Sequence, residues 1–548
     1  MLIDSTCKRP GSWLGRIAVA LVAMIGLLAE AKAQAPQAKA APVAPQAKAA
    51  PKPADDNAVE ALSLHYRFTE HYSPVPDPNH PEFITQYRVG ARETTKISLD
   101  NPGGAPIRGE IVRHTIYTER VARATRAGDL TDAVRRYDRF FYKDFTAKND
   151  ASHPSKGAFQ GLTLWVGERV KSGPQVINLT ADRLIREFEY LTIQSLVSPS
   201  RLKGLLPPTP PRIGDTWRIP LPATIVLLPE LPEPENYSLE GTLIEVHKTD
   251  QPRTHAAILG IQGQFTMPEG PSALNARITF TFKTPEPKPA TDGAEAPPTR
   301  TNSGVIEARG MITELRLARI ITSPIPEGDG RLQQTTNYEL LIGREPTAIP
   351  LAGDPTATLL ALPDPIPKPD EANSWVLYDD PAGRFHLRHP QNLRVIDSAS
   401  SDVDLEFRDI QDDHVDVFGL QLQPGEGNGD QARLFRDPEY HRRNMFKNWE
   451  KQGQDVVKGP IGWLPEADWT PSKRKVYRIE AALRPQGSAA NSPRVYSDCY
   501  LASLPSNKSI FVTTMTTQDP HVPYRDQVES MIRSFDFGPS RPAPSPAK

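Results

Sequence analysis

The sequence is poor in cysteine, in net charge and in long apolar runs. Its 548 residues include two cysteines, and 64 basic residues balance 66 acidic ones. A balanced charge gives no electrostatic footprint for nucleic acid, so we predict no nucleic-acid partner. The apolar run at residues 17–28 is shorter than the ~20 residues that span a bilayer. We therefore expect no stable transmembrane segment once an N-terminal signal has been cleaved.

Short sequence signatures of catalysis are also missing. The sequence has no Gly-x-Ser-x-Gly, His-Glu-x-x-His, Cys-x-x-Cys or phosphate-binding glycine loop. Cys499 lies in the strand-like stretch YSDCYLAS, where a packed thiol is expected rather than a nucleophile. Loss of Cys7 with a signal would leave Cys499 unable to form an intrachain disulfide. These patterns predict no catalytic residue, no metal ligand and no cofactor.

The first 33 residues have the features of an export signal. Three basic residues precede the apolar run, and Ala31 and Ala33 follow it as the small residues of a cleavage site. Cleavage of residues 1–33 places the protein in the periplasm or outside the cell, with attachment to a surface left open. The alternative is that the segment is retained as an anchor.

Proline marks the boundaries between segments of the chain. There are 57 prolines, about twice the average share. The Ala-, Pro-, Lys- and Gln-rich segment after the signal has little to bury, which is typical of a disordered tether. The expected segments are 1–33 (signal peptide), 34–57 (disordered Ala/Pro/Lys tether), 58–345 (β-rich domain with a disordered loop near 285–304), 346–373 (proline-rich linker), 374–538 (α+β domain) and 539–548 (disordered tail).

Alternation of apolar and polar residues dominates the domain at 58–345. In the stretch ITFTFK, Ile278, Phe280 and Phe282 fall on one face of a strand. Similar stretches recur between Gly, Pro and Asn residues, with a few helical turns around residues 183–202. We predict a mostly antiparallel β domain, either a sandwich or a partial barrel.

A short motif lies inside this domain. Gly214, Asp215 and Trp217 follow a proline-rich stretch and precede several strand-like segments. This order resembles uncharacterised bacterial exported β-domains with a Gly-Asp-x-Trp motif, over about residues 205–342. The residues themselves predict a turn at Gly214 and a strand that begins with a buried Trp217, rather than a catalytic Asp215.

From residue 374 the pattern changes to α+β. Strand-like segments alternate with a helix that starts at an Asp-Pro pair and with a final helix that has Val528, Met531 and Phe535 on one stripe. This order resembles the PsbP/DcrB-like α/β sandwich superfamily. The residues that carry the resemblance are Tyr378, Asp379, Gly383, Phe385, Pro390, Ser534, Phe535 and Phe537. The resemblance implies a PsbP-like sandwich and a binding role, with no shared active site.

Two groups of residues in the second domain raise the question of a metal site. His386 and His389 are separated by an odd number of residues, so in a strand their side chains point to opposite faces. The six aspartates between residues 401 and 417 lack the Asp-x-Asp-x-Asp-Gly spacing of a calcium loop. Alternation around Leu405 and Phe407 instead predicts a hairpin with the acids on its outer face and turn. We predict no metal at either place.

One candidate ligand surface remains. Residues 134–145, VRRYDRFFYKDF, interleave basic and aromatic side chains, a pattern that can stack bases or hold sugars and acyl head groups. An amphipathic strand gives the same pattern. The predicted ligand face consists of Arg135, Arg136, Tyr137, Arg139, Phe141 and Tyr142.

These patterns lead to three hypotheses of function. The first is an exported, non-catalytic protein that binds an envelope or extracellular partner through both of its domains. The second is a carrier of a lipid or other apolar ligand in the β domain, which requires an enclosed apolar cavity. The third is an enzyme with an unrecognised active site, which requires convergent polar groups with shifted pKa values in a cleft.

Overall fold

The computed structural model describes most of the chain between Leu64 and Gly538. The described ranges are 64–77, 79–80, 82–100, 107–144, 160–167, 175–181, 183–195, 199–220, 223–224, 227, 237–267, 270–283, 305–324, 333–347, 359–396, 404–410, 415–423, 438–465, 475–488, 494–503 and 509–538. The predicted signal, tether, tail and loop near 285–304 lie outside these residues. The described residues form two compact units that divide between Ser374 and Trp375. We call them the β-rich unit and the C-terminal unit.

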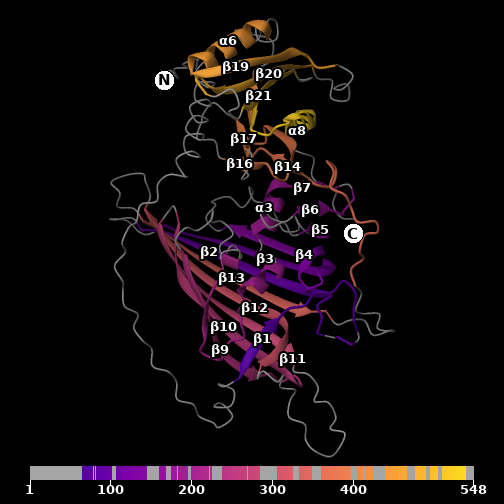
Figure 1. Cartoon of the computed structure of the whole chain (residues 1–548), viewed down its shortest axis with the longest axis vertical. Helices are drawn as coiled ribbons and strands as arrows, with labels where there is room; N and C mark the ends of the chain where they lie inside the picture. Colours follow the sequence, from indigo (N-terminus) through magenta and orange to yellow (C-terminus); the bar gives the residue numbers. More distant parts are fainter. Residues whose placement is uncertain are drawn as a thin grey trace, which may run out of the picture. The chain divides into compact units, whose positions relative to one another are not determined.

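One twelve-stranded sheet builds the β-rich unit (Figure 1). Its strand order is β6-β5-β4-β3-β2-β13-β12-β11-β10-β9-β8, and β1 joins the sheet by pairing in parallel with β12. The strands are β1 (His65–Thr69), β2 (Gln86–Asp100), β3 (Ile107–Ala124), β4 (Leu130–Asp144), β5 (Thr163–Gly167), β6 (Gln175–Asn178), β8 (Thr216–Arg218), β9 (Tyr237–Lys248), β10 (Thr254–Met267), β11 (Gly270–Lys283), β12 (Val305–Pro324) and β13 (Gln333–Pro346). The predicted antiparallel β domain is confirmed, and within the described residues it is one sheet, not a sandwich of two.

Alternation along the strands sorts apolar side chains onto one face of this sheet. Every second residue of β11 is buried, from Leu274 to Phe282. The register extends this face across the strands, because Ile278 pairs with Leu259 on one side and with Leu315 on the other. We call this buried face the inner face and the opposite one the outer face.

The segment between β6 and β9 contains the expected helical turns and the expected turn before a strand. The helical turns are α3 (Glu187–Ser195) and the 3-10 helix η1 (Pro199–Leu205), and the short strand β7 (Ile185–Arg186) comes just before α3. Gly214 has a positive φ of 93°, and Trp217 is buried in β8. The indole of Trp217 lies over Gly241, where an added Cβ atom would come within 2.3 Å of the ring. The predicted turn and buried tryptophan are confirmed.

Residues 359–373, the second half of the segment expected to be a linker, pack on the β-rich unit. Leu360 is buried in a cluster with Val134, Trp165 and Ile177. The amide of Leu360 donates to Gln86 Oε1 at 2.8 Å. These residues are therefore part of the unit and not a free connection.

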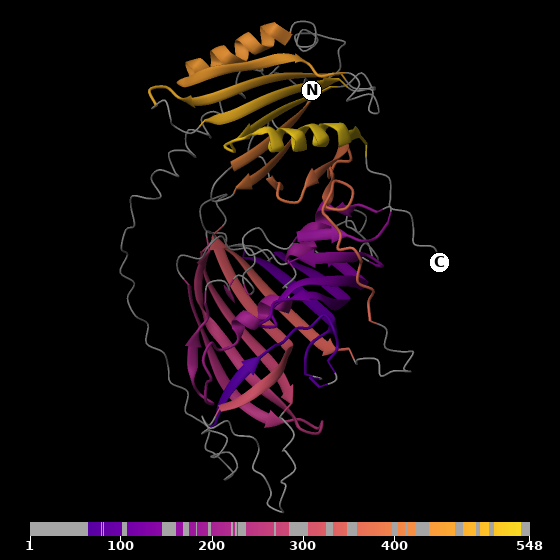
Figure 2. The ribbon, with the colours of Figure 1, turned by 45° about the vertical axis from the view of Figure 1, so that its right-hand side comes forward.

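The C-terminal unit has a seven-stranded antiparallel sheet with a helix on each side (Figure 2). Its strand order is β16-β17-β18-β22-β21-β20-β19, and β14, β15 and β23 pair separately. The elements are β14 (Trp375–Asp379), β15 (Phe385–Pro390), β16 (Arg394–Ile396), β17 (Leu405–Ile410), β18 (Val415–Gln423), α6 (Pro438–Lys451), β19 (Gln454–Trp463), β20 (Lys475–Pro485), β21 (Val495–Ser503), β22 (Ser509–Thr516), α8 (Val522–Ser534) and β23 (Asp536–Phe537). No helix among the described residues is long and apolar enough to span a bilayer.

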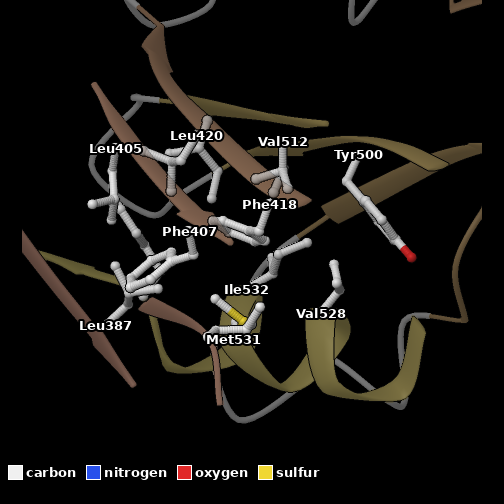
Figure 3. Close-up of a cluster of buried hydrophobic side chains, with 14 of the residues drawn as sticks. Leu387, Leu405, Phe407, Phe418, Leu420, Tyr500, Val512, Val528, Met531 and Ile532 are labelled. Atoms are coloured by element: carbon white, nitrogen blue, oxygen red, sulfur yellow. The ribbon is translucent and has the colours of Figure 1, made fainter. Parts of the chain in front are cut away.

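Each helix packs on its own face of this sheet. Val528 and Met531 of α8 belong to one apolar cluster (Figure 3), whereas Met445 of α6 belongs to another. The neighbouring strand residues Tyr500 and Leu501 join opposite clusters, as the alternation of a strand requires. The predicted apolar stripe of the last helix is confirmed.

Candidate functional site

The sheet of the β-rich unit is split between β12 and β13. The two strands are paired up to Glu314 and Gly343. The register of β12 against β11 then shifts by one residue, so that Thr313 is a bulge. Beyond the bulge, β1 takes the place of β13 beside β12. Because a bulge bends its strand and ends regular pairing, β12 and β13 diverge from this point.

A buried ion pair fills the start of the split. Arg344 Nη1 donates to Glu70 Oε1 at 2.8 Å, and both side chains are fully buried. Glu70 also accepts a hydrogen bond from the amide of Ile312 at 2.6 Å, and Arg344 donates to the carbonyl of Ile312 at 3.2 Å. Tyr72 OH donates to Glu70 Oε2 and accepts from Arg344 Nη2, both at 2.7 Å. The pair therefore satisfies the hydrogen bonds of the backbone amide and carbonyl of Ile312, which a neighbouring strand would otherwise satisfy.

The surroundings of this pair fix the protonation states of Arg344 and Tyr72. Burial lowers the pKa of Arg344, but Glu70, Tyr72 and Tyr87 outweigh it, so that the pKa lies well above its ordinary value. Burial raises the pKa of Tyr72 well above its ordinary value. Arg344 is thus charged and Tyr72 neutral throughout the physiological pH range. A buried pair of this kind is stable only while both charged members are present.

The divergence of the strands opens a cleft of about 1310 Å³. One wall consists of the β9–β10 turn and the ends of β11 and β12. The other wall consists of the segment before β2 and the end of β13. Thr279 and Thr281 line the cleft and alternate with the buried Phe280, so the cleft opens on the outer face. We call this feature the strand-split cleft.

Hydroxyl groups form much of the lining of the strand-split cleft. Seven of the lining residues are threonines. Thr281 Oγ1 and Thr313 Oγ1 are 2.8 Å apart, and Thr313 Oγ1 donates to the carbonyl of Thr279 at 3.3 Å. The bulge at Thr313 therefore also orients polar groups into the cleft.

An ion pair and a stack of rings fix the two walls. Arg309 Nη1, on the β12 wall, lies 3.5 Å from Glu82 Oε1, on the opposite wall. Burial raises the pKa of Glu82, but hydrogen bonds from its own backbone amide and from His80 outweigh it, so that the pKa is lowered. Phe83 stacks on His71 and on His80, with ring centres 3.9 Å and 4.7 Å away. Two rings at these separations cannot share one face of Phe83, so both of its faces are covered.

Two residues of the predicted ligand face lie inside the β-rich unit. Arg135 and Tyr137 are buried on the inner face. Arg135 Nε donates to Glu119 Oε2 at 2.7 Å, and Arg135 Nη1 donates to Tyr137 OH at 3.3 Å. Glu119 also accepts a hydrogen bond from Tyr87 OH. Arg135 and Tyr137 therefore belong to a buried network and not to a surface.

The other four predicted residues are divided between the two faces of β4. A bulge at Asp138 changes which residues share a face. Arg136 and Arg139 are exposed on the outer face together with the half-buried Phe141, and Tyr142 is half-buried on the inner face. The six residues do not form one surface. Ligand binding by the three on the outer face stays a prediction.

The two histidines of the C-terminal unit point apart. They lie in β15, which is a strand as predicted. His389 is fully buried, with its ring 4.5 Å from that of Phe407. On the other side of the strand, His386 Nδ1 lies 2.9 Å from the carbonyl oxygen of Gly538. The predicted divergence of the two imidazoles is confirmed.

The acidic stretch forms the predicted hairpin, β17 and β18, but two of its acids are not on the outer face. Asp409 and Asp416 are register partners and are buried. Asn392 Nδ2 donates to Asp409 Oδ2 at 2.7 Å, and Gln518 Nε2 donates to Asp416 Oδ2 at 2.5 Å. These amide donors allow the carboxylates to be buried. Among the described residues, no group of three or more histidines, cysteines or acids is placed to hold a metal ion.

Local sequence patterns do not identify the residues that build the cleft. Arg344 has the same parity in β13 as the buried Leu340 and Ile342, so it occupies an inner-face position. The sequence signal that could have identified Arg344 is a charged residue at a strand position where apolar residues are expected. Its partner Glu70 lies 274 residues away in the chain, and no local pattern joins the two.

Comparisons with known proteins give only distant likenesses. No family model matches the chain, and no curated protein matches it. PsbP from the cyanobacterium Synechocystis sp. PCC 6803 is 15% identical over 30% of this chain and 92% of its own, with a TM-score of 0.23. Lipovitellin is 9% identical over 49% of this chain and 26% of its own, with a TM-score of 0.24. A LolA superfamily protein from Nitrosomonas europaea is 10% identical over 50% of this chain and 90% of its own, with a TM-score of 0.09. TM-scores of this size establish no shared fold.

Proposed function

We propose that this protein is exported and, without catalysis, binds an envelope or extracellular partner in the strand-split cleft. The observation that carries the proposal is the cleft itself. Its volume of about 1310 Å³ exceeds the ~300–1,000 Å³ of ordinary small-ligand pockets, so it has room for a segment of a larger partner. Features of the N-terminal sequence, three basic residues followed by an apolar run and small residues, support export.

The charges of the cleft favour binding over proton transfer. A general acid or base needs a pKa near the operating pH. The pKa of Glu82 is shifted downward, away from that range, and its carboxylate is paired with Arg309. Arg344 is held as a cation by Glu70. These paired groups are therefore unsuited to proton transfer, which leaves the exposed lining residues to bind a partner.

The proposal extends to the C-terminal unit, which we assign to a PsbP-like sandwich with a binding role. Residues from both ends of this unit that carry the sequence resemblance meet in one aromatic cluster. Phe385 stacks on Phe535 with ring centres 5.3 Å apart, and Phe535 contacts Phe537 edge-on at 5.3 Å. Phe537 is the register partner of Phe385. This closure of the unit by its last strand supports the assignment.

A carrier function is the second candidate, because the inner face of the sheet is largely apolar, although a lipid bound there would have to displace the side chains that bury this face. Leu259, Ile278 and Leu315 form one row of that face, and all three are buried. Organic extraction of the purified protein followed by mass spectrometry separates the two candidates. The cleft proposal predicts an extract without stoichiometric lipid, and a lipid in molar amount favours the carrier.

Photo-crosslinking at two positions of one strand tests the proposed function. Thr281 and Asn275 lie on the outer face of β11, and only Thr281 lines the cleft. A benzophenone amino acid at position 281 of the full exported chain is expected to crosslink a defined partner in intact cells. The same amino acid at position 275 is expected to give no such product. Equal products at both positions, or none at either, would count against the cleft as the binding site.

A further inference from the structure

We infer that the occupant of the strand-split cleft is a basic, extended segment of the partner protein. This inference rests on the proposed function and adds the chemistry of the ligand. It depends on three observations: the charges that line the cleft, the lack of an open aromatic face, and the polar groups along the β11 and β12 wall.

Carboxylates outnumber cations among the described residues of the lining. The carboxylates are Asp77, Glu82, Asp250, Glu314 and Glu345. The cations are Lys283, Arg309 and Arg344. Arg344 is already neutralised by Glu70, which lies behind the lining, and Arg309 is paired with Glu82. The lining therefore keeps an excess of negative charge, which attracts a basic ligand.

Two of these carboxylates are placed where the basic side chains of an extended ligand could reach them. Asp250 and Glu345 are exposed and come from opposite walls, the β9–β10 turn and the end of β13. Glu314 is less available, because Arg316 Nε donates to it at 2.6 Å. A chain with spaced basic side chains can therefore reach acceptors on both walls.

The two aromatic residues of the lining, Phe83 and Phe282, do not favour a sugar or a base, and Phe282 is buried with His255 stacked on its ring. Sugars and bases bind by stacking on an open aromatic face. Phe83 lines the cleft, but His71 and His80 cover both of its faces. The threonine hydroxyls of the opposite wall, with the buried Met311 between them, suit instead the alternating polar and apolar groups of an extended peptide.

The test measures binding of a fluorescein-labelled peptide of alternating lysine and alanine, about ten residues long, to the full exported chain. A peptide of alternating glutamate and alanine serves as the control ligand. We expect binding of the basic peptide only, and we expect the affinity to fall as salt rises from about 50 mM to about 500 mM.

Variants that remove a negative charge and a variant that removes a positive charge should shift the affinity in opposite directions. Misfolding would lower the affinity in both cases. The double variant Asp250→Asn with Glu345→Gln is expected to weaken binding about five- to tenfold at low salt, and Arg309→Ala is expected to strengthen it. Glu339→Gln is the matched control, because Glu339 lies on the same face of β13 outside the cleft, and it is expected to change affinity less than about twofold.

Three results would overturn the inference. The first is equal binding of the basic and acidic peptides, and the second is equal loss of affinity in Glu339→Gln and in the double variant. The third is a marked gain in peptide affinity when residues 34–57 are deleted, which would mean that the lysines of this chain occupy the cleft. If the basic peptide fails to bind but crosslinking at Thr281 still yields a partner, the proposed function stands and only the basic chemistry is wrong.

Discussion

At the scale of single residues, the buried pair of Glu70 and Arg344 is the main structural feature of the split in the β-rich unit. Both are charged, and both are fully buried on the inner face. They are tolerated there because each binds a backbone group of Ile312 that has lost its neighbouring strand. The ion pair is therefore a structural part of the cleft.

Removal of one member of this pair is expected to destabilise the fold strongly. Arg344→Met leaves Glu70 buried without its cation, a change that costs about 3–5 kcal/mol in comparable proteins. The free energy of unfolding, measured with urea, should fall by this amount. The double variant Glu70→Leu with Arg344→Met should recover part of the loss. Arg67→Ala, which breaks the exposed pair with Glu307, is the control and should cost no more than about 1 kcal/mol.

Histidines in the β-rich unit make its stability depend on pH. Burial is the main cause that lowers the pKa of His71, His114 and His255 below the ordinary value of 6.5. The unfolded chain therefore binds more protons than the folded chain at acid pH, so stability is lost as the pH falls below about 6.5. Urea midpoints at about pH 7.5 and pH 5.5 should show this loss, and His71→Gln should reduce it. A larger loss in the variant would contradict the assignment.

At the scale of elements, the sequence predicts strands well and their partners poorly. The alternation in β11 predicts the buried face that the structure shows, because each strand position is sorted locally by burial. The split between β12 and β13 is filled by the pair of Glu70 and Arg344. These two residues are 274 positions apart in the chain, so no local pattern includes both. In β4 a single bulge at Asp138 exchanges the faces of the residues after it, so the predicted ligand face could not be read from alternation alone.

The fit between Trp217 of β8 and Gly241 of β9 gives a test at this scale. A methyl group at position 241 would lie 2.3 Å from the indole ring, so Gly241→Ala must displace either the ring or the strand. We expect a loss of about 1–3 kcal/mol in the free energy of unfolding. Gly90→Ala is the matched control, since Gly90 lies in β2 of the same sheet and an added Cβ there meets no atom within 4 Å. Equal losses would show that the ring does not lie over the glycine.

At the scale of the whole molecule, the described residues form two units, each with its own core. The two apolar clusters of the C-terminal unit consist entirely of residues from Trp375 onward. A change of composition predicts the boundary near residue 374, because proline-rich sequence interrupts the patterning there. It does not predict that Leu360 is buried in the β-rich unit, since one apolar residue among prolines has no periodic pattern.

Independent folding of the C-terminal unit follows from this division. Residues 375–538, expressed alone, contain both clusters and the helices α6 and α8. We expect a single cooperative urea transition with a midpoint close to that of the same unit in the full chain. A fragment with native-like secondary structure but no cooperative transition would show that the unit needs the rest of the chain.

The central claim is that the Glu70–Arg344 pair takes the place of a strand beside Ile312, at the start of the cleft that opens beyond the bulge. Hydrogen exchange at the amide of Ile312, measured in the full chain and in the double variant Glu70→Leu with Arg344→Met, tests it most directly. In the double variant the amide of Ile312 should exchange much faster, because its carboxylate acceptor is gone, while Leu317, paired with strands on both sides, should be unchanged. Equal protection of Ile312 in both proteins would contradict the claim.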